Sequence, residues 1–155
     1  VDPEAVEAAR VFLAATAEKM GLALAVTARG DGADVVLTLE GRDAERAVGR
    51  KGATLDALQL LANRVASRAA DGERAGLVVD AAGYRARREK TLTTMAEQLG
   101  ARCVEQGKVI TMDPLPPRER RVVHMALARF PGVTTRSEGD GEERRIQIIP
   151  MPVPR

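Results

Sequence analysis

The chain has 155 residues, of which 45% are hydrophobic and 30% charged, so it can form one domain or two small ones. Its net charge is +2, but residues 1–40 carry three Lys/Arg against seven Asp/Glu, so the remaining chain carries +6 and is expected to hold a basic working surface. One cysteine and one histidine exclude an internal disulfide and a zinc site of the usual Cys/His type, and no secretory segment or apolar run of about 18 residues is present, which predicts a soluble, cytoplasmic protein with no membrane insertion and no cofactor.

The pattern of apolar and turn-forming residues predicts the element order α-β-β-α-α-β for the first half of the chain. Asp2 is expected to cap a helix that begins at Pro3 and ends near Lys19. The next expected elements are strands at 22–28 and 35–40 joined by a turn at 29–32, a short helix at 42–48, a long helix at 54–70 and a strand at 77–79. The long helix is expected to face inward with Leu55, Leu58, Leu61, Ala62 and Val65.

The second half of the chain predicts a smaller α/β unit. Its expected elements are a long helix at 82–106, a short strand at 109–111, a helix from Pro117 to Arg129, and a hairpin of strands at 133–137 and 144–149. Cys103 is expected to be a small buried side chain, and residues 151–155 are expected to form a flexible tail.

Gly49-Arg50-Lys51-Gly52, between the two adjacent helices, is the most informative stretch of the sequence. Glycine lacks a Cβ, so the backbone can turn tightly and approach a ligand closely. We expect the first amides of the following helix to be unpaired and to attract an anion, with Arg50 and Lys51 adding charge. The stretch therefore predicts a site for a single-stranded nucleic acid, although the same pattern also occurs in ordinary turns between helices.

The chain has three aromatic residues, Phe12, Tyr84 and Phe130. They are too few for the platforms on which RRM and OB domains stack bases. A bound base is therefore expected to lie against aliphatic side chains, for which Val48, Leu55 and the strand at 35–39 are the candidates. Arg42 and Arg46 could help to bind the ligand or could form only a solvated helix face.

Arg120 and His124 are four residues apart, so on a helix they share one face. A guanidinium and an imidazole can together hold a phosphate or the edge of a base, and Arg121 and Arg118 could extend that surface. The alternative is a structural histidine with a ring nitrogen bonded to the backbone. A second basic cluster could continue the path of the nucleic acid or be only a solvated helix face: Arg85, Arg87, Arg88 and Lys90.

Two motifs, in this order, resemble those of a known bacterial family. Residues 47–59 (AVGRKGATLDALQ) resemble the KH core of the Jag family, also called SpoIIIJ-associated protein or KhpB. Residues 119–124 (ERRVVH) resemble the domain named for an arginine and a histidine separated by three residues, which follows the KH domain in this family. The resemblance covers residues 1–150 and does not extend to the further N-terminal domain that family members often carry.

The resemblance implies an α+β protein with a type II KH domain at 1–80, an Arg-xxx-His domain at 81–150 and a tail at 151–155. It implies that there are no catalytic residues and no metal ligands. The implied nucleic-acid-binding residues are Gly49, Arg50, Lys51, Gly52, Arg120, Arg121 and His124. Where the family often has Asn-Pro before the second motif, this chain has Pro116-Pro117, so we expect the loss of a side-chain N-cap at a cost of about 1 kcal/mol.

By this resemblance, the chain is expected to bind single-stranded RNA, with single-stranded DNA as a second ligand, and to regulate genes of cell elongation or division after transcription. A small single-KH protein of the KhpA type, or a second copy of the chain, is the expected protein partner. The alternative is a protein-interaction adaptor that uses the KH surface for dimerisation or docking. An enzyme is least supported, because His124 has no cysteine or serine at an informative spacing and no ATP-binding loop is present.

Overall fold

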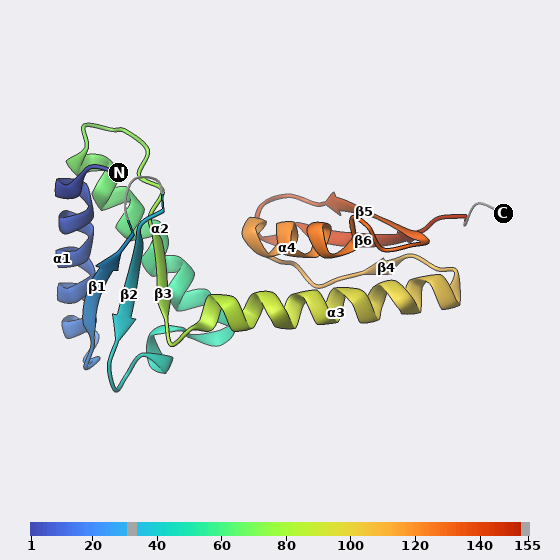
Figure 1. Cartoon of the computed structure of the whole chain (residues 1–155), viewed down its shortest axis with the longest axis horizontal. Helices are drawn as coiled ribbons and strands as arrows, with labels where there is room; N and C mark the ends of the chain where they lie inside the picture. The colour runs from blue at the N-terminus through green and yellow to red at the C-terminus, as the bar shows by residue number, and fades with distance from the viewer. Residues whose placement is uncertain (31–33, 153–155) are drawn as a thin grey trace. The chain divides into compact units, whose positions relative to one another are not determined.

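The computed structural model describes residues 1–30 and 34–152, and it divides the α+β chain into two compact units at 1–85 and 86–155 (Figure 1). We call them unit 1 and unit 2. Residues 31 and 32 of the expected turn, and residues 153–155 of the expected tail, lie outside the described residues. Within the described part of the chain, no helix combines the length and the apolar character that a membrane span requires.

Unit 1 contains a three-stranded sheet with two α-helices packed against it (Figure 1). Its elements are α1 (Pro3–Lys19), β1 (Ala25–Arg29), β2 (Val36–Glu40), the 3-10 helices η1 (Glu45–Ala47) and η2 (Arg50–Gly52), α2 (Ala53–Ala69) and β3 (Val78–Ala81). Strand β2 lies in the middle, antiparallel to β1 and parallel to β3. The chain from β2 to β3 passes through α2, because parallel neighbours need a long crossover.

The core of unit 1 lies between the two helices and one face of the sheet. Alternate strand residues point into it, and Leu37, Leu39 and Val79 are at most 1% exposed. Every fourth residue of α1 is buried along one line, and most of these residues are small: Ala5, Ala9, Leu13 and Ala17. Their size allows α1 and α2 to pack closely against each other.

The expected first helix is confirmed, together with its cap, since the Asp2 carboxylate accepts a hydrogen bond from the Glu4 amide at 3.0 Å. Two other expectations for unit 1 are wrong. Residues 22–24 lie outside the strand, because the amide of Leu22 donates to a helix carbonyl and that of Ala23 donates to the Asp43 carboxylate. The expected helix at 42–48 is only the 3-10 turn η1, because the left-handed backbone of Gly49 stops it within one turn.

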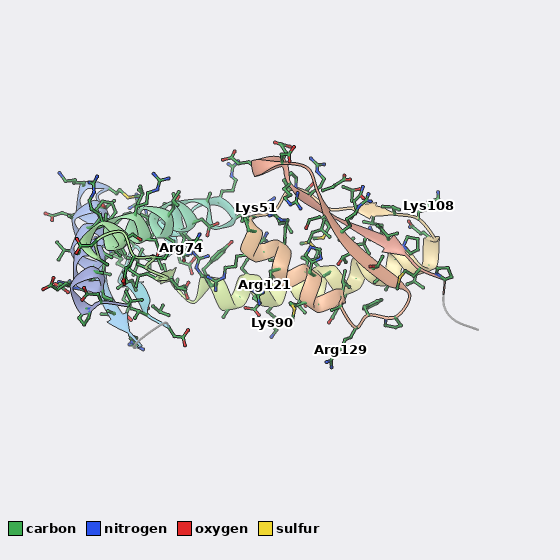
Figure 2. All side chains as sticks on the ribbon, turned by 90° about the horizontal axis from the view of Figure 1, so that it is seen from above. Lys51, Arg74, Lys90, Lys108, Arg121 and Arg129 are labelled. Atoms are coloured by element: carbon green, nitrogen blue, oxygen red, sulfur yellow. The ribbon has the colours of Figure 1, made fainter. Side chains whose placement is uncertain are left out.

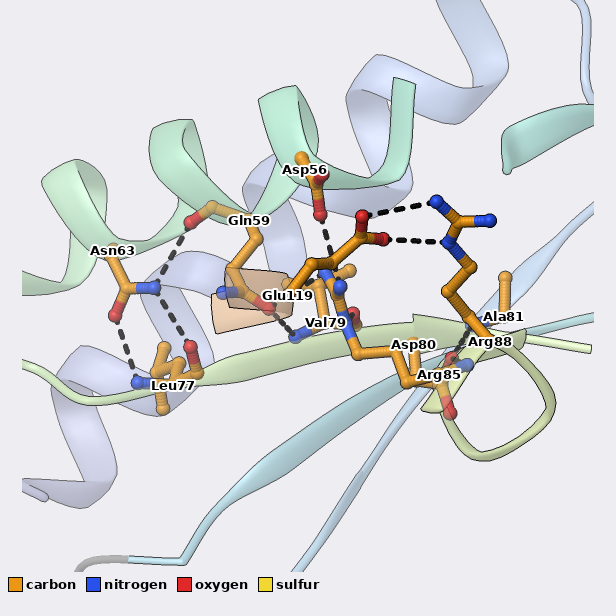
Figure 3. Close-up of polar contacts among 10 residues, drawn as sticks. All are labelled: Asp56, Gln59, Asn63, Leu77, Val79, Asp80, Ala81, Arg85, Arg88 and Glu119. Atoms are coloured by element: carbon orange, nitrogen blue, oxygen red, sulfur yellow. Dashed lines mark hydrogen bonds and ion pairs between the residues drawn. The ribbon is translucent and has the colours of Figure 1, made fainter. Parts of the chain in front are cut away.

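The buried stripe of α2 is narrower than expected. Leu55, Leu58, Ala62 and Ala66 are buried, whereas Leu61 is 44% exposed. The polar residues beside this stripe face β3 and cover its outer edge (Figure 3).

The outer edge of β3 is paired with side chains instead of a strand. Asn63 Oδ1 accepts from the Leu77 amide and Asn63 Nδ2 donates to the Leu77 carbonyl, both at 2.8 Å. Gln59 Oε1 accepts from the Val79 amide at 3.0 Å, and Arg85 Nε donates to the Val79 carbonyl at 2.8 Å. Backbone groups that would otherwise lack partners at this edge are therefore satisfied.

Unit 2 contains a second three-stranded sheet, which is antiparallel throughout and has β6 in the middle. Its elements are α3 (Tyr84–Gln106), β4 (Ile110–Thr111), α4 (Pro117–Leu127), β5 (Val133–Glu138), the 3-10 helix η3 (Gly141–Glu143) and β6 (Arg145–Pro150). The expected elements are confirmed with small shifts at their ends. Helix α3 begins two residues late, because Ala82 and Gly83 adopt positive φ angles of 53° and 65° and form a turn.

Helices α3 and α4 pack closely in unit 2. A Cβ on Gly100 would lie 3.0 Å from Leu127, so a larger residue there would push the helices apart. Arg88 of α3 forms a two-pronged ion pair with Glu119 of α4 at 2.9 and 3.2 Å (Figure 3), and both side chains are less than 20% exposed. Cys103 is buried as expected, and burial raises the pKa of its thiol.

Candidate nucleic-acid interface

The loop between η1 and α2 turns through three residues with positive φ angles. These angles are 73° at Gly49, 51° at Lys51 and 77° at Gly52. A Cβ on Gly52 would lie 2.6 Å from the Tyr84 ring, and one on Gly49 would lie 2.7 Å from the Cβ of Thr54. Only glycine fits these two positions, because a side chain would be strained and would also collide with its neighbours.

The two cations of this loop are exposed to solvent. Among the residues that the structure describes, neither Arg50 nor Lys51 forms an ion pair. Figure 2 labels Lys51, which lies directly before α2. A non-glycine residue in the left-handed conformation costs on the order of 1–2 kcal/mol. The fold thus maintains a strained backbone at the position of an exposed ammonium group.

The expectation that the first amides of α2 are unpaired is wrong for two of them. The Ala53 amide donates to the Arg50 carbonyl, and the Leu55 amide donates to the Val48 carbonyl at 3.1 Å. The cause is the left-handed loop, which folds its own carbonyl groups over the helix end. Attraction of an anion to this end of α2 therefore depends mainly on the side chains of Arg50 and Lys51.

The aliphatic side chains that were expected to cover bases are not on the surface. Val48 is 5% exposed, Leu55 is fully buried, and both belong to the core of unit 1 together with Leu37 and Leu39. A shallow hollow of about 470 Å³ does lie where β2 ends. It is lined by residues 38–42, Ala44, Glu45, Ala82 and Gly83. Most of this lining is polar or small, so it offers little aliphatic surface.

Arg42 and Arg46 flank Asp43 at the start of this segment. The Asp43 carboxylate accepts a hydrogen bond from the Ala23 amide at 2.7 Å, which, with the nearby arginine charges, holds the pKa of Asp43 below its usual value. Arg46 Nη1 lies 3.6 Å from the same carboxylate. Arg46 is therefore partly engaged in a local ion pair, whereas Arg42 forms no ion pair within the described ranges.

In unit 2, His124 connects α4 to β5. Its Nδ1 lies 2.7 Å from the Thr135 hydroxyl and its Nε2 lies 2.8 Å from the Ser137 hydroxyl. Thr135 and Ser137 are two residues apart on one strand, so both hydroxyls face the same side of the sheet. One turn earlier, Arg120 Nη1 donates to the Leu115 carbonyl at 2.7 Å. The structural alternative for His124 thus has support, with hydroxyl groups rather than the backbone as its partners.

The environment of His124 favours the neutral ring. Burial lowers its pKa, and the positive charge of Arg120 lowers it further. A neutral imidazole offers one donor and one acceptor, which two hydroxyl groups can match. Protonation would place a second cation beside Arg120 and would make both ring nitrogens donors.

The basic cluster at the start of α3 is not a uniform solvated face. Arg85 donates to the Asp56 carboxylate at 3.0 Å (Figure 3), and Arg88 forms the buried ion pair described above. Arg87 and Lys90 are exposed. Two of the four cations therefore hold the fold together.

The expected site residues fall into two separate groups. Unit 1 brings together the four residues of the loop, and α4 brings together Arg120, Arg121 and His124. Of these, Arg121 is exposed, whereas Arg120 and His124 are half-buried. Sequence reasoning missed Thr135 and Ser137, for which the only signal is a pair of hydroxyl residues at alternate positions of the next strand.

Residues 90–150, which contain the site on α4, match the family of the Arg-xxx-His domain. The fold and this match define an α+β protein that carries an Arg-xxx-His domain. The RNA-binding protein KhpB of Bacillus subtilis (strain 168) is 30% identical to this chain over 150 residues, which are 96% of the chain and 71% of the relative. The chain belongs to the KhpB family.

Two further relatives carry the same name. RNA-binding protein KhpB of Clostridium symbiosum is 32% identical over 112 residues, which are 72% of this chain and 50% of that protein. RNA-binding protein KhpB of Lactiplantibacillus plantarum is 36% identical over 101 residues, which are 65% of this chain and 31% of that protein. The matched part thus spans half or less of these two relatives.

Proposed function

We propose that the chain is a cytoplasmic, single-stranded RNA-binding protein, with a type II KH domain at 1–80 and an Arg-xxx-His domain at 81–150. The names of its relatives support the ligand, and the match of residues 90–150 supports the second domain. The order of elements in unit 1, with a Gly-x-x-Gly loop directly before α2, supports the first. The observation that carries the proposal is the loop at 49–52, which presents two exposed cations on a backbone shaped by two glycines.

In this proposal, the sugar-phosphate chain crosses the loop in unit 1. Gly49 and Gly52 bring the backbone close, and Arg50 and Lys51 contact phosphates, as expected for a KH domain that clamps about four nucleotides. Phosphate contacts supply affinity but little choice of sequence. Single-stranded DNA is therefore a second ligand, distinguished from RNA only where a 2′-hydroxyl is contacted.

We also propose a cellular role, which rests on the resemblance to the Jag family. The bound transcripts belong to genes of cell elongation or division, and binding regulates them after transcription. A small single-KH protein of the KhpA type, or a second copy of this chain, is the proposed protein partner.

The test is a charge reversal in the loop, Arg50→Asp with Lys51→Asp, measured by fluorescence anisotropy with a mixed-sequence RNA 12-mer. We expect loss of most of the affinity, because two attractive charges become repulsive next to phosphates. The wild-type affinity should fall steeply as salt rises.

The matched control is Arg68→Asp with Arg74→Asp, which makes the same change of charge on two other exposed cations of unit 1. Arg68 is 17 residues from Lys51 along the chain, near the other end of α2, so about 25 Å separates them along the helix. If the control lowers the affinity as much as the loop variant, binding depends on net charge and not on the loop. An unchanged affinity of a folded loop variant would overturn the proposal.

The adaptor function is a second candidate, because unit 1 has exposed apolar side chains on its helices. Val11 on α1 is 51% exposed and Leu60 on α2 is 56% exposed. An adaptor predicts self-association or partner binding that persists at high salt and after nuclease treatment, since apolar contacts are not screened. Sedimentation of the purified chain over a range of concentrations, with and without RNA, distinguishes the two functions.

A further inference from the structure

One face of α4 is exposed along its whole length. Arg118, Arg121, Met125 and Arg129 are exposed and follow one another at intervals of three or four residues. That spacing places them along a single line on the helix and the turn that follows it. We call these four residues the α4 stripe; Figure 2 labels Arg121 and Arg129.

The charge of the α4 stripe is not neutralised. Glu119 is the only carboxylate of α4, and it is paired with Arg88 away from the stripe. Within residues 1–30 and 34–152, none of the three arginines of the stripe forms an ion pair. The stripe therefore offers three guanidinium groups to an anionic ligand, and a guanidinium matches phosphate geometry well.

Met125 lies among these arginines. It is 68% exposed, more than any other large hydrophobic side chain in the described part of the protein. Its thioether is flexible and polarisable and makes favourable contacts with aromatic rings. The aromatic side chains Phe12, Tyr84 and Phe130 are all partly buried, so they do not provide an open surface for a base.

We propose that the α4 stripe is a second site for single-stranded RNA, in which the arginines contact phosphates and Met125 covers one base. This inference rests on the proposed function. From Arg118 to Arg129 the stripe is about 16 Å long, which is room for roughly four stacked nucleotides. The arrangement assigns different roles on one helix, because Arg120 and His124 hold α4 in place while their neighbours face the ligand.

The first test follows the methionine methyl groups of the intact chain by NMR after ¹³C-methyl labelling, as an RNA 12-mer is added. The chain has five methionines: Met20, Met95, Met112, Met125 and Met151. We expect an upfield shift of the Met125 methyl signal, because a covering base places it in the ring current. Met20 and Met95 are 45% and 37% exposed and serve as internal controls that should not move.

The second test measures the affinity of Met125→Ala and Met125→Leu for the 12-mer and for an abasic oligonucleotide of the same length. We expect Met125→Ala to bind the 12-mer about two- to tenfold more weakly, to bind the abasic strand like the wild type, and to be largely rescued by leucine. Val109→Ala is the matched control, since Val109 is an apolar residue of unit 2 that is 52% exposed outside the stripe. It should leave both affinities unchanged.

The possible outcomes separate the two proposals. RNA binding that leaves the Met125 signal and the affinity of Met125→Ala unchanged would overturn the stripe while the proposed function stands. Equal shifts of all exposed methionines, or an equal loss with Val109→Ala, would also overturn it. No binding of RNA by the wild-type chain would overturn both.

Discussion

The loop at 49–52 and helix α4 are both basic, and each can be recognised in the sequence, but they present their charges differently. In the loop, the motif residues themselves face solvent, and the glycines on either side hold a backbone with three positive φ angles. On α4, the two residues that define the motif turn inward, where Arg120 bonds a carbonyl and His124 bonds two hydroxyls. A motif can thus mark either the contact surface or the scaffold beneath it.

The largest effect that tests this comparison is expected from Gly52→Ala. The new Cβ would be strained at a φ of 77° and would collide with the Tyr84 ring, so we expect a loss on the order of 3 kcal/mol in the free energy of unfolding. Gly21→Ala is the matched control, because its φ is 74° but nothing lies within 4 Å. It should cost only about 1 kcal/mol. Equal losses in urea denaturation would show that the Tyr84 contact does not shape the loop.

A smaller loss is expected when the ion pair behind α4 is broken. Glu119→Gln leaves the mostly buried Arg88 without its charged partner, which should cost about 2 kcal/mol in the stability of unit 2. The comparison variant is Glu7→Gln, which removes an exposed pair with Arg10 and should cost less than about 0.5 kcal/mol. Denaturation curves of both variants that overlap would contradict a structural role for the pair.

Replacing His124 tests whether the α4 motif is a scaffold. His124→Ala removes two hydrogen bonds to β5 and should cost about 1–2 kcal/mol of stability. RNA affinity at a temperature where the variant is fully folded should change little. A large loss of affinity with unchanged stability would instead place the ring in contact with RNA.

The same histidine makes stability depend on pH. Its folded-state pKa lies below its ordinary value of about 6.5, so at mildly acidic pH the unfolded chain binds the proton more readily than the folded chain. The stability of unit 2 should therefore be complete above that value and fall as the pH drops through it toward the folded pKa. His124→Gln should remove this part of the slope, and an identical slope in both proteins would contradict the assignment.

The smallest effect is a gain at the start of α4. Pro116 occupies the N-cap without a side-chain hydrogen bond, which confirms that the capping group is missing. Pro116→Asn should stabilise unit 2 by less than about 1 kcal/mol, because the new cap is partly offset by a more flexible unfolded chain. A loss of stability would show that the rigid Pro116-Pro117 pair matters more than a cap.

Regular elements with strong periodicity could be predicted from the sequence. The capped first helix and the final hairpin are examples, since their apolar spacing and turn residues agree. The segment at 42–48 could not, because its helical pattern is stopped by a loop whose φ angles depend on contacts with Thr54 and Tyr84. Local propensity does not contain such contacts.

The site was predictable to the same extent. The exposure of Arg50 and Lys51 follows from a turn between two glycines, but the pairing of the Ala53 and Leu55 amides depends on how that turn folds back. The partners of His124 lie 11 and 13 residues further along, so no local pattern identifies them.

The side chains that pair with the outer edge of β3 also bear on how unit 1 folds. Asn63 and Gln59 reach backbone groups only 14 and 20 residues further along the chain, so these bonds close short loops at a low entropic cost. The β2–β3 pairing joins residues 42 apart, as in Val36 with Val78, and must wait for a longer loop. Helix α2 and β3 therefore form a local hairpin-like nucleus that can present β3 to β2 already bonded along its other side.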